Sequence, residues 1–232
     1  MKYIRIDSSM RDKSIYPNSN NFQIKLKSTV INLKEVVLKN CNIPNAIYNV
    51  NKWNNKFTFT VGIIDYNVVL VKANYDIVEL CNEMKNKMNS LVGGFNVTNL
   101  QNKITITNAT PFRLKLDKIF AKLIGFKEND PTISISFTSP NFVSLYSTRW
   151  YYLLVNEFTN NDENPQPCTG VIMNNVQYGG IRTNDNNEYI FRTSTNRNLN
   201  VQCMTISLYD ENYNLVDFEG IDYFLEFQVC EF

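Results

Sequence analysis

Apolar and polar residues alternate with a period of two in several short stretches of this chain. The apolar positions are Phe57/Phe59/Val61, Ile104/Ile106, Ile133/Ile135/Phe137, Met204/Ile206/Leu208 and Leu225/Phe227/Val229. Such alternation predicts strands with one buried face. Clusters of Asn, Asp, Gly and Pro separate these runs, as at 184–187 and 210–214, and these residue types favour turns. The pattern predicts a mainly β fold of the sandwich type.

Two segments in the N-terminal half instead have helical spacing. In the first, Asn74 is the expected N-cap and Gly93-Gly94 the expected end, and one face carries Ile77, Leu80, Met84, Met88 and Leu91. The second, shorter helix is expected to begin after Asp117 and to end at Gly125 in a left-handed conformation, with Ile119, Phe120 and Leu123 on its apolar face. We therefore expect one or two short helices beside the sheets.

The sequence favours a single domain, 1–232, with an elaborated N-terminal half. Strand patterns continue on both sides of the best exposed-loop candidate, 159–167, which is crowded with Pro, Asn and acidic residues. A subdivision near 127–140 is the alternative. At 232 residues, the chain can bury enough apolar surface to fold without disulfides.

Charge and cysteine content narrow the class of protein. The formal net charge is +1, which does not suit a dedicated nucleic-acid binder. The five cysteines are widely spaced and odd in number (Cys41, Cys81, Cys168, Cys203 and Cys230). Without a Cys-x-x-Cys pair, they are expected to be reduced thiols. No run reaches the roughly 20 apolar residues of a membrane span, so we expect no membrane insertion.

The usual catalytic and cofactor motifs are missing. The chain contains no histidine, which excludes Ser-His-Asp and Cys-His catalysis and histidine-based zinc sites. It also lacks a phosphate-binding loop and a dinucleotide fingerprint. We therefore expect no enzyme activity, no cofactor and no metal, although a pair of carboxylates could in principle serve a hydrolase.

The one dense acidic cluster, 210–222, begins like a calcium loop with Asp210-x-Asn212-x-Asn214. Leu215 stands where that loop requires glycine, and Ile221 stands where it requires glutamate. We interpret the cluster as solvated hairpin turns.

Motifs along nearly the whole chain resemble the vertex, or penton, minor capsid proteins of virophages, Polinton-like viruses and their giant-virus relatives. The N-terminal motifs are Ile6-Asp7-Ser8…Arg11-Asp12, Phe22-x-Ile24-x-Leu26 and Ile43-Pro44-Asn45 before Tyr48-Asn49. The central ones are Asn74-Tyr75…Leu80…Met84…Met88, 94–97, 103–106 and 123–126. The last are 206–212, Val216-Asp217-Phe218 and Gly220-Ile-Asp222. Their order along the chain carries the resemblance.

The resemblance implies a jelly-roll antiparallel β-sandwich that works as a structural virion protein. Copies would form homopentamers at the five-fold vertices of an icosahedral capsid and bind the major capsid protein. The protein would be made in the host cytoplasm or viral factory. Alternatives are a cement protein under the major capsid lattice, or an attachment head that binds a host receptor or glycan.

Seven residues are candidate subunit contacts. Arg5, Asp7, Arg11 and Asp12 offer charges for ion pairs between subunits. Arg149 and Trp150 open the run Arg149-Trp-Tyr-Tyr152, whose composition suits interface hot spots or stacking on a sugar or base; the same run also suits a buried strand with polar aromatic tips at its rim. Trp53 lies among polar residues, as either an exposed contact or a turn residue folded onto the core.

Overall fold

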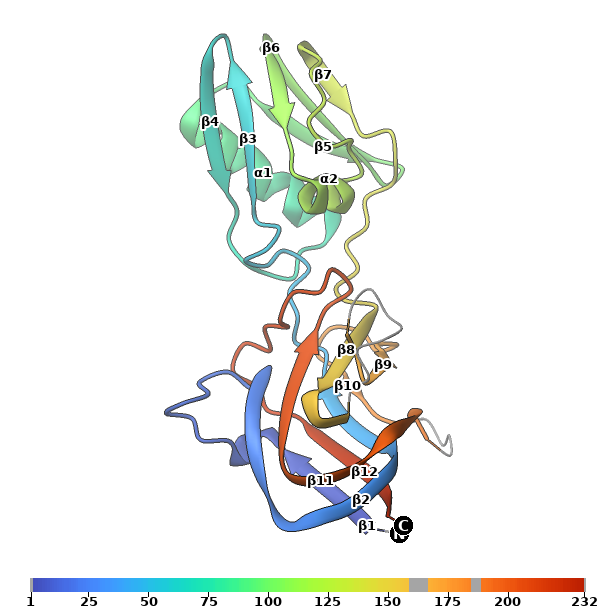
Figure 1. Ribbon diagram of the computed structural model, residues 1–232. Coiled ribbons are helices and arrows are strands. Elements are labelled where there is room, and N and C mark those ends of the chain that lie inside the picture. The colour runs from blue at the N-terminus through green and yellow to red at the C-terminus, as the bar shows by residue number, and fades with distance from the viewer. Residues whose placement is uncertain (1, 159–166, 185–188, 232) are drawn as a thin grey trace. The chain divides into compact units, whose positions relative to one another are not determined.

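The computed structural model describes residues 2–158, 167–184 and 189–231 (Figure 1). The chain folds as two compact units: unit 1 comprises residues 1–47 and 148–232, and unit 2 comprises residues 48–147. The chain crosses between them at 47/48 and 147/148, whereas the sequence suggested a subdivision near 127–140. That the whole chain acts as one capsid domain stays a prediction. The predicted loop at 159–167 lies outside the described residues except for its last position.

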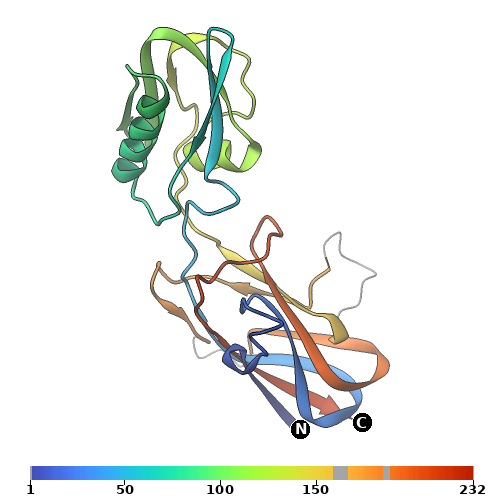
Figure 2. The ribbon, with the colours of Figure 1, turned by 90° about the vertical axis from the view of Figure 1, so that its left-hand side faces the viewer.

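Unit 1 is an antiparallel β structure. Its elements are β1 (Lys2–Asp7), the 3-10 helix η1 (Ser8–Met10), β2 (Asn21–Pro44), β8 (Trp150–Val155), the 3-10 helix η2 (Asn156–Phe158), β9 (Gly170–Met173), β10 (Ile181–Arg182), β11 (Phe191–Tyr209) and β12 (Phe224–Glu231). The strand order is β1-β12-β2-β11-β8-β9, and β10 pairs with β2. Since β1 pairs with β12, the two chain ends lie at the same end of unit 1 (Figure 2).

The long strands β2 and β11 let this sheet fold over its own core. Residues 33–42 of β2 pair with β12, whereas residues 21–25 pair with residues 203–207 of β11. Register shifts interrupt the β2–β11 ladder between Ser194 and Cys203, and such irregularities bend strands. As a result, Phe158 beside β8 meets Phe227 of β12 at 6.3 Å between ring centroids. The two halves of the sheet face each other as in a β-sandwich.

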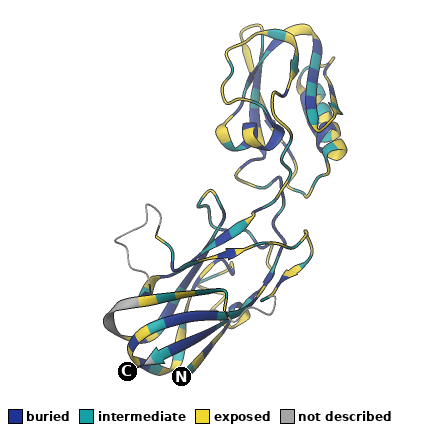
Figure 3. Cartoon of the chain, turned by 90° about the vertical axis from the view of Figure 1, so that its right-hand side faces the viewer, coloured by how far each residue is buried: buried dark blue, intermediate teal, exposed yellow. Residues whose placement is uncertain are grey.

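The alternating positions predicted in β11 and β12 form the centre of this core. Met204, Ile206, Leu225, Phe227 and Val229 are each 0% exposed, and buried positions recur along these strands (Figure 3). All five belong to one cluster that also receives residues of β1, β2 and β8. The prediction of strands with a buried face is confirmed here.

Unit 2 combines an antiparallel sheet with two helices. Its elements are β3 (Lys56–Val61), β4 (Ile64–Val69), α1 (Ile77–Leu91), β5 (Asn96–Leu100), β6 (Lys103–Lys115), α2 (Lys118–Ile124) and β7 (Ser134–Thr138). The strand order is β4-β3-β6-β5, and β7 pairs with β6. Both helices pack on one core: Met84 and Met88 of α1 are 0% exposed, and Phe120 of α2 stacks on Phe57 of β3 at 4.9 Å. Unit 2 therefore has a core of its own.

The ends of α1 and α2 can be compared with the ends that the sequence predicts. Asp117 caps α2 by accepting from Phe120 N at 2.7 Å, and Gly125 is left-handed with φ 77°, as predicted. Asn74 as the cap of α1 is wrong. Asp76 caps this helix, because its carboxylate accepts from Glu79 N (2.8 Å) while the Glu79 carboxylate accepts from Asp76 N (2.9 Å). This reciprocal capping box satisfies two helix-end donors, which a lone Asn cannot do.

The pattern at Ile133, Ile135 and Phe137 predicts one buried face, and this prediction is wrong for its first two positions. Ile133 and Ile135 are 60% and 54% exposed, whereas Phe137 packs on the core. The strand itself is present as β7, and β6 is its one partner strand among the described residues. The mainly β fold of antiparallel sheets with two helices in the N-terminal half is confirmed, and unit 1 is consistent with a jelly-roll-type sandwich.

Candidate functional site

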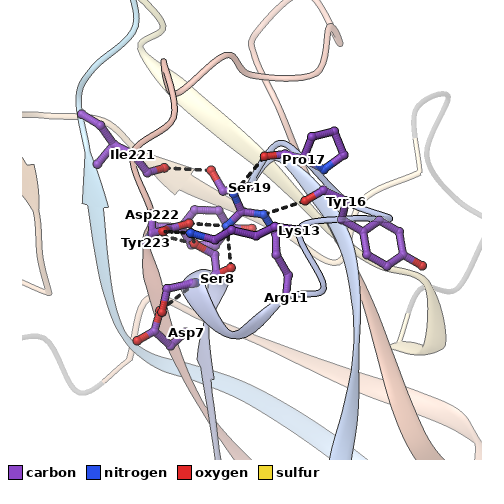
Figure 4. Close-up of polar contacts among 11 residues, drawn as sticks. Asp7, Ser8, Arg11, Lys13, Tyr16, Pro17, Ser19, Ile221, Asp222 and Tyr223 are labelled. Carbon is purple, nitrogen blue, oxygen red and sulfur yellow. Dashed lines mark hydrogen bonds and ion pairs between the residues drawn. The ribbon is translucent and has the colours of Figure 1, made fainter.

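The loop after β1 and the segment before β12 meet in a buried polar cluster that we name the terminal clamp (Ser8, Arg11, Asp222 and Tyr223). Its central residue is Arg11, which is 6% exposed. The Arg11 guanidinium donates to the Asp222 carboxylate and to three backbone carbonyls: Ser8 at 2.6 Å, Tyr16 at 2.9 Å and Pro17 at 3.0 Å (Figure 4). One buried cation therefore fixes the path of the whole 8–17 loop.

Ser8 completes the terminal clamp from the other side. Its Oγ donates to Asp222 Oδ1 at 3.0 Å and accepts from Tyr223 N at 2.8 Å. Its backbone N donates to Tyr223 O at 2.9 Å. Nearby, Ser19 Oγ donates to Ile221 O at 2.8 Å. The β1–β12 pairing is thus continued by side chains beyond the ends of both strands.

The terminal clamp changes the acidity of its carboxylate. Burial alone would raise the pKa of Asp222, but hydrogen bonds from Arg11 and Ser8 and the charges of Arg11 and Lys13 outweigh burial and lower it. The Lys13 ammonium lies 3.7 Å from this carboxylate. Asp222 is therefore held in its charged form as the partner of Arg11.

The other three N-terminal candidates lie around the terminal clamp. Arg5 pairs with Glu226 at 2.7 Å, and its side chain is 70% exposed. Asp7 caps η1 by accepting from Ser9 N at 2.8 Å. Asp12 is exposed and accepts from the hydroxyl and backbone N of Ser14. Whether any of these charges, or Arg11, contacts another subunit stays a prediction; the structure gives Arg11 a role within its own chain.

Arg149 and Trp150 belong to an aromatic surface on unit 1, which we define as Arg149, Trp150, Tyr152, Tyr209 and Tyr213. The Arg149 guanidinium lies 4.8 Å from the Trp150 ring centroid. Trp150 and Tyr152 are 6.5 Å apart, Tyr152 and Tyr213 are 5.8 Å apart, and Tyr209 and Tyr213 stack at 4.4 Å. All four rings are half-buried. They form a continuous, partly exposed aromatic strip.

The alternation of β8 explains why this strip faces outward. Tyr151 is 0% exposed in the core, whereas Trp150 and Tyr152 on either side point away from it. Arg149 is fixed at the rim by an ion pair with Glu211 at 2.8 Å. Residues 149–152 therefore meet both expectations from their composition: they are part of a strand with a buried face, and they place aromatic rings at its partly exposed rim.

Trp53 lies in unit 2 as an exposed turn residue. Its side chain is 43% exposed, and its backbone N donates to Asn51 Oδ1 at 2.9 Å. The Lys52 ammonium lies 5.0 Å from the ring centroid. The ring is therefore available for contact, and it is not folded into the core.

The acidic segment 210–222 forms turns, and exposed Glu219 fits its interpretation as solvated turns, but two of its carboxylates do not. Asp210 is 9% exposed and accepts from Asn212 N (2.9 Å) and Asn214 N (2.8 Å). Burial raises its pKa, and these hydrogen bonds oppose that rise. Asp222 is the partner of Arg11. Sequence reasoning missed both roles, and the turn signal Asp-x-Asn was the one local clue to the first.

The described residues contain no group of three or more His, Cys, Asp or Glu side chains placed to hold a metal ion. All five cysteines are described, and none forms a disulfide. Over the same parts of the chain, no helix is long and apolar enough to cross a membrane.

Together, the fold and these contacts define a mainly antiparallel β protein of two units. A polar clamp joins the loop after β1 to the segment before β12, at the end of this ladder opposite to the chain termini, and unit 1 and unit 2 both carry partly exposed aromatic residues. The chain belongs to the family described as "Family of unknown function (DUF5901)", whose model matches residues 2–218. No curated protein matches the sequence. Among solved structures, the crystal structure of the mavirus penton protein aligns with 99% of this chain and 100% of its own, at 11% identity and a TM-score of 0.49.

Proposed function

We propose that this protein is a structural virion component, a minor capsid protein whose copies form pentamers at the five-fold vertices of an icosahedral capsid. The observation that carries the proposal is the terminal clamp. Two of the motifs behind the resemblance, at Asp7-Ser8…Arg11 and at Gly220-Ile-Asp222, lie more than 200 residues apart and meet through the Arg11–Asp222 contact. The β1–β12 pairing brings these two motifs together, and their side chains then form one buried cluster, which is what we expect of two motifs that belong to the same structural feature.

Assembly requires surfaces that bind other copies, and the structure offers two candidates. Trp, Tyr and Arg are enriched at interface hot spots, and the aromatic surface holds Trp150 beside Arg149 at its exposed rim. Trp53 is the second candidate. In a closed ring, each copy presents one surface to the next and receives another in return. The major capsid protein would bind a further surface, and no bond-making chemistry is part of this function.

In this proposal the whole chain serves as one capsid building block, located in the virion shell and made in the host cytoplasm or viral factory. The test is co-expression with the major capsid protein of the same virus, followed by electron microscopy of the particles. Closed shells with density at every vertex support the proposal when that density is lost on omitting this chain. Shells with complete vertices in its absence overturn it.

A glycan-binding attachment head is the second candidate, and the exposed aromatic rings favour it specifically. Trp53 and Trp150 present partly exposed rings on different units, and flat rings of this kind stack on sugars. A glycan array with the wild type and with Trp150→Ala distinguishes the two functions. Specific binding that the substitution abolishes would support the attachment head. A cement role under the capsid lattice would place the density between vertices in the same particles.

A further inference from the structure

Two strands of unit 1 each have one edge without a partner strand in the described part of the chain. Within the described residues β1 pairs with β12 alone, so its other edge has no partner strand there. Residues 21–25 of β2 pair with β11 on one side, and no described strand forms a ladder on their other side. Open edges present backbone donors and acceptors that can pair with another strand.

The open edges of β1 and β2 border the same groove, which has a volume of about 270 Å³. Its apolar floor combines Ile4 and Ile6 of β1, which are buried, with Ile24 and Leu26 of β2, which are half-buried and pack against the core. Lys2 Nζ reaches across to Thr29 O at 3.3 Å. The full lining is Lys2, Tyr3, Ile4, Arg5, Ile6, Met10, Ile24, Lys25, Leu26, Lys27, Ser28 and Val30.

The charged side chains that line this groove are all positive. Four of the lining residues are cations (Lys2, Arg5, Lys25 and Lys27), and none is an acid. Arg5 is neutralised in part by Glu226 at 2.7 Å. Lys25 and Lys27 are exposed, and among the described residues neither has an ion-pair partner. A carboxylate placed over the groove would therefore meet uncompensated positive charge.

We propose that this groove binds an extended acidic peptide segment of a partner protein. This segment would pair as an added strand with one of the two open edges that border the groove. Alternate side chains of an added strand point to opposite faces. The side chains on one face of the added strand would pack on the apolar floor between Ile4 and Leu26. The side chains on its other face would be carboxylates that point towards Lys25 and Lys27. Backbone pairing supplies affinity and the side chains supply selectivity, as in other strand additions.

The same lysines also suit two other roles, and each is an outcome of the test below. Lysines on edge strands keep open edges from pairing at all. A row of cations also attracts nucleic acid, but the apolar floor and the open backbone edges favour a peptide over a sugar-phosphate chain. This inference does not depend on the capsid proposal, because the groove lies within unit 1 and its binding is measured on the isolated protein.

The experiment is fluorescence anisotropy of the full chain with a labelled nine-residue peptide that alternates Val and Glu. We expect saturable binding, and we expect the Kd to rise at least tenfold with Lys25→Glu/Lys27→Glu. The matched control is Lys118→Glu/Lys127→Glu, the same charge change on exposed positions of unit 2, which should leave the Kd unchanged. A peptide with alternate backbone amides N-methylated keeps its side chains but cannot pair as a strand, and it should also bind at least tenfold more weakly.

Four results would overturn the proposal. The first is no binding by the wild type, which would leave the lysines as edge protection. The second is equal binding of a Val/Lys peptide, and the third is equally effective displacement by a nine-nucleotide oligo-dT, which would make the groove a general anion surface. The fourth is self-association that Lys25→Glu/Lys27→Glu abolishes while no peptide binds, which would assign the groove to a second copy of this chain.

Discussion

Arg11 donates to one carboxylate and three backbone carbonyls while almost fully buried. Arg11→Ala would leave these acceptors without their donor, and leaving buried hydrogen-bonding groups unsatisfied costs about 1–3 kcal/mol. We expect a loss of this size in the free energy of unfolding of unit 1, measured by urea denaturation.

The matched control is Lys13→Ala. The Lys13 side chain is 61% exposed and lies 3.7 Å from the same Asp222 carboxylate, and exposed pairs contribute about 0–1 kcal/mol. Equal losses from the two substitutions would show that Arg11 has no structural role beyond an ordinary surface charge.

The lowered pKa of Asp222 predicts a dependence of stability on pH. A carboxyl group whose pKa is lower in the folded state than in the unfolded state stabilises the fold above its unfolded pKa, and this contribution is lost as pH falls through the folded pKa. The reference value for Asp222 is 3.8. We therefore expect the stability difference between wild type and Asp222→Asn to be constant from about pH 7 to pH 5 and to shrink below about pH 4.

Urea denaturation of both proteins across this pH range measures the effect. Asp12→Asn is the comparison, because Asp12 also has a lowered pKa but accepts hydrogen bonds from Ser14 and Ile15 within its own exposed loop. A stability difference for Asp222→Asn that stays constant down to about pH 3 would contradict a charged Asp222 in the fold.

At the element scale, the capping box of α1 gives a direct comparison between two neighbouring residues. Asp76 accepts from Glu79 N at 2.8 Å, and replacing such a cap by Ala typically costs about 1 kcal/mol. Asp76→Ala should destabilise unit 2 by about this amount, whereas Asn74→Ala should change its stability by less than about 0.5 kcal/mol. Thermal unfolding followed by circular dichroism tests both variants. If Asn74→Ala destabilised unit 2 more than Asp76→Ala does, Asn74 would be the cap that stabilises α1.

The elements themselves were largely predictable because their signals are local. Period-two alternation located β11 and β12, and the spacing of Leu80, Met84 and Met88 located α1. The start of α1 was missed because the sequence offers two capping residues within three positions, and the reciprocal bond from Glu79 decides between them. The exposed face of β7 was missed because periodicity does not show what covers a strand.

The terminal clamp was predictable only in part. Arg11 was singled out as a charge near the terminus, but its partner Asp222 lies 211 residues further along the chain. No spacing rule connects residues so far apart, since their contact results from the β1–β12 pairing. The groove between β1 and β2 was equally hidden, because it depends on which strand edges remain open after the sheet has formed.

At the scale of the whole molecule, unit 2 has the features of an independently folding insertion. It has a core of its own. Asn49, near its first residue, donates from Nδ2 to Leu145 O near its last residue (3.2 Å) and to Tyr75 O (2.7 Å). We expect residues 48–147 alone to unfold cooperatively, with an unfolding enthalpy of about 60–80 kcal/mol for a domain of this length. Scanning calorimetry measures it, and the absence of a cooperative transition would show that unit 2 needs unit 1 to fold.

The proposed function requires that copies of the chain assemble into a closed ring. The most direct measurement is the solution mass of the purified full chain by light scattering. A pentamer would give five times the chain mass of 27.0 kDa, or about 135 kDa, and negative-stain images should then show five-fold rings. A monomer of 27.0 kDa that stays monomeric when mixed with the major capsid protein, or a stable trimer, would contradict the proposed function.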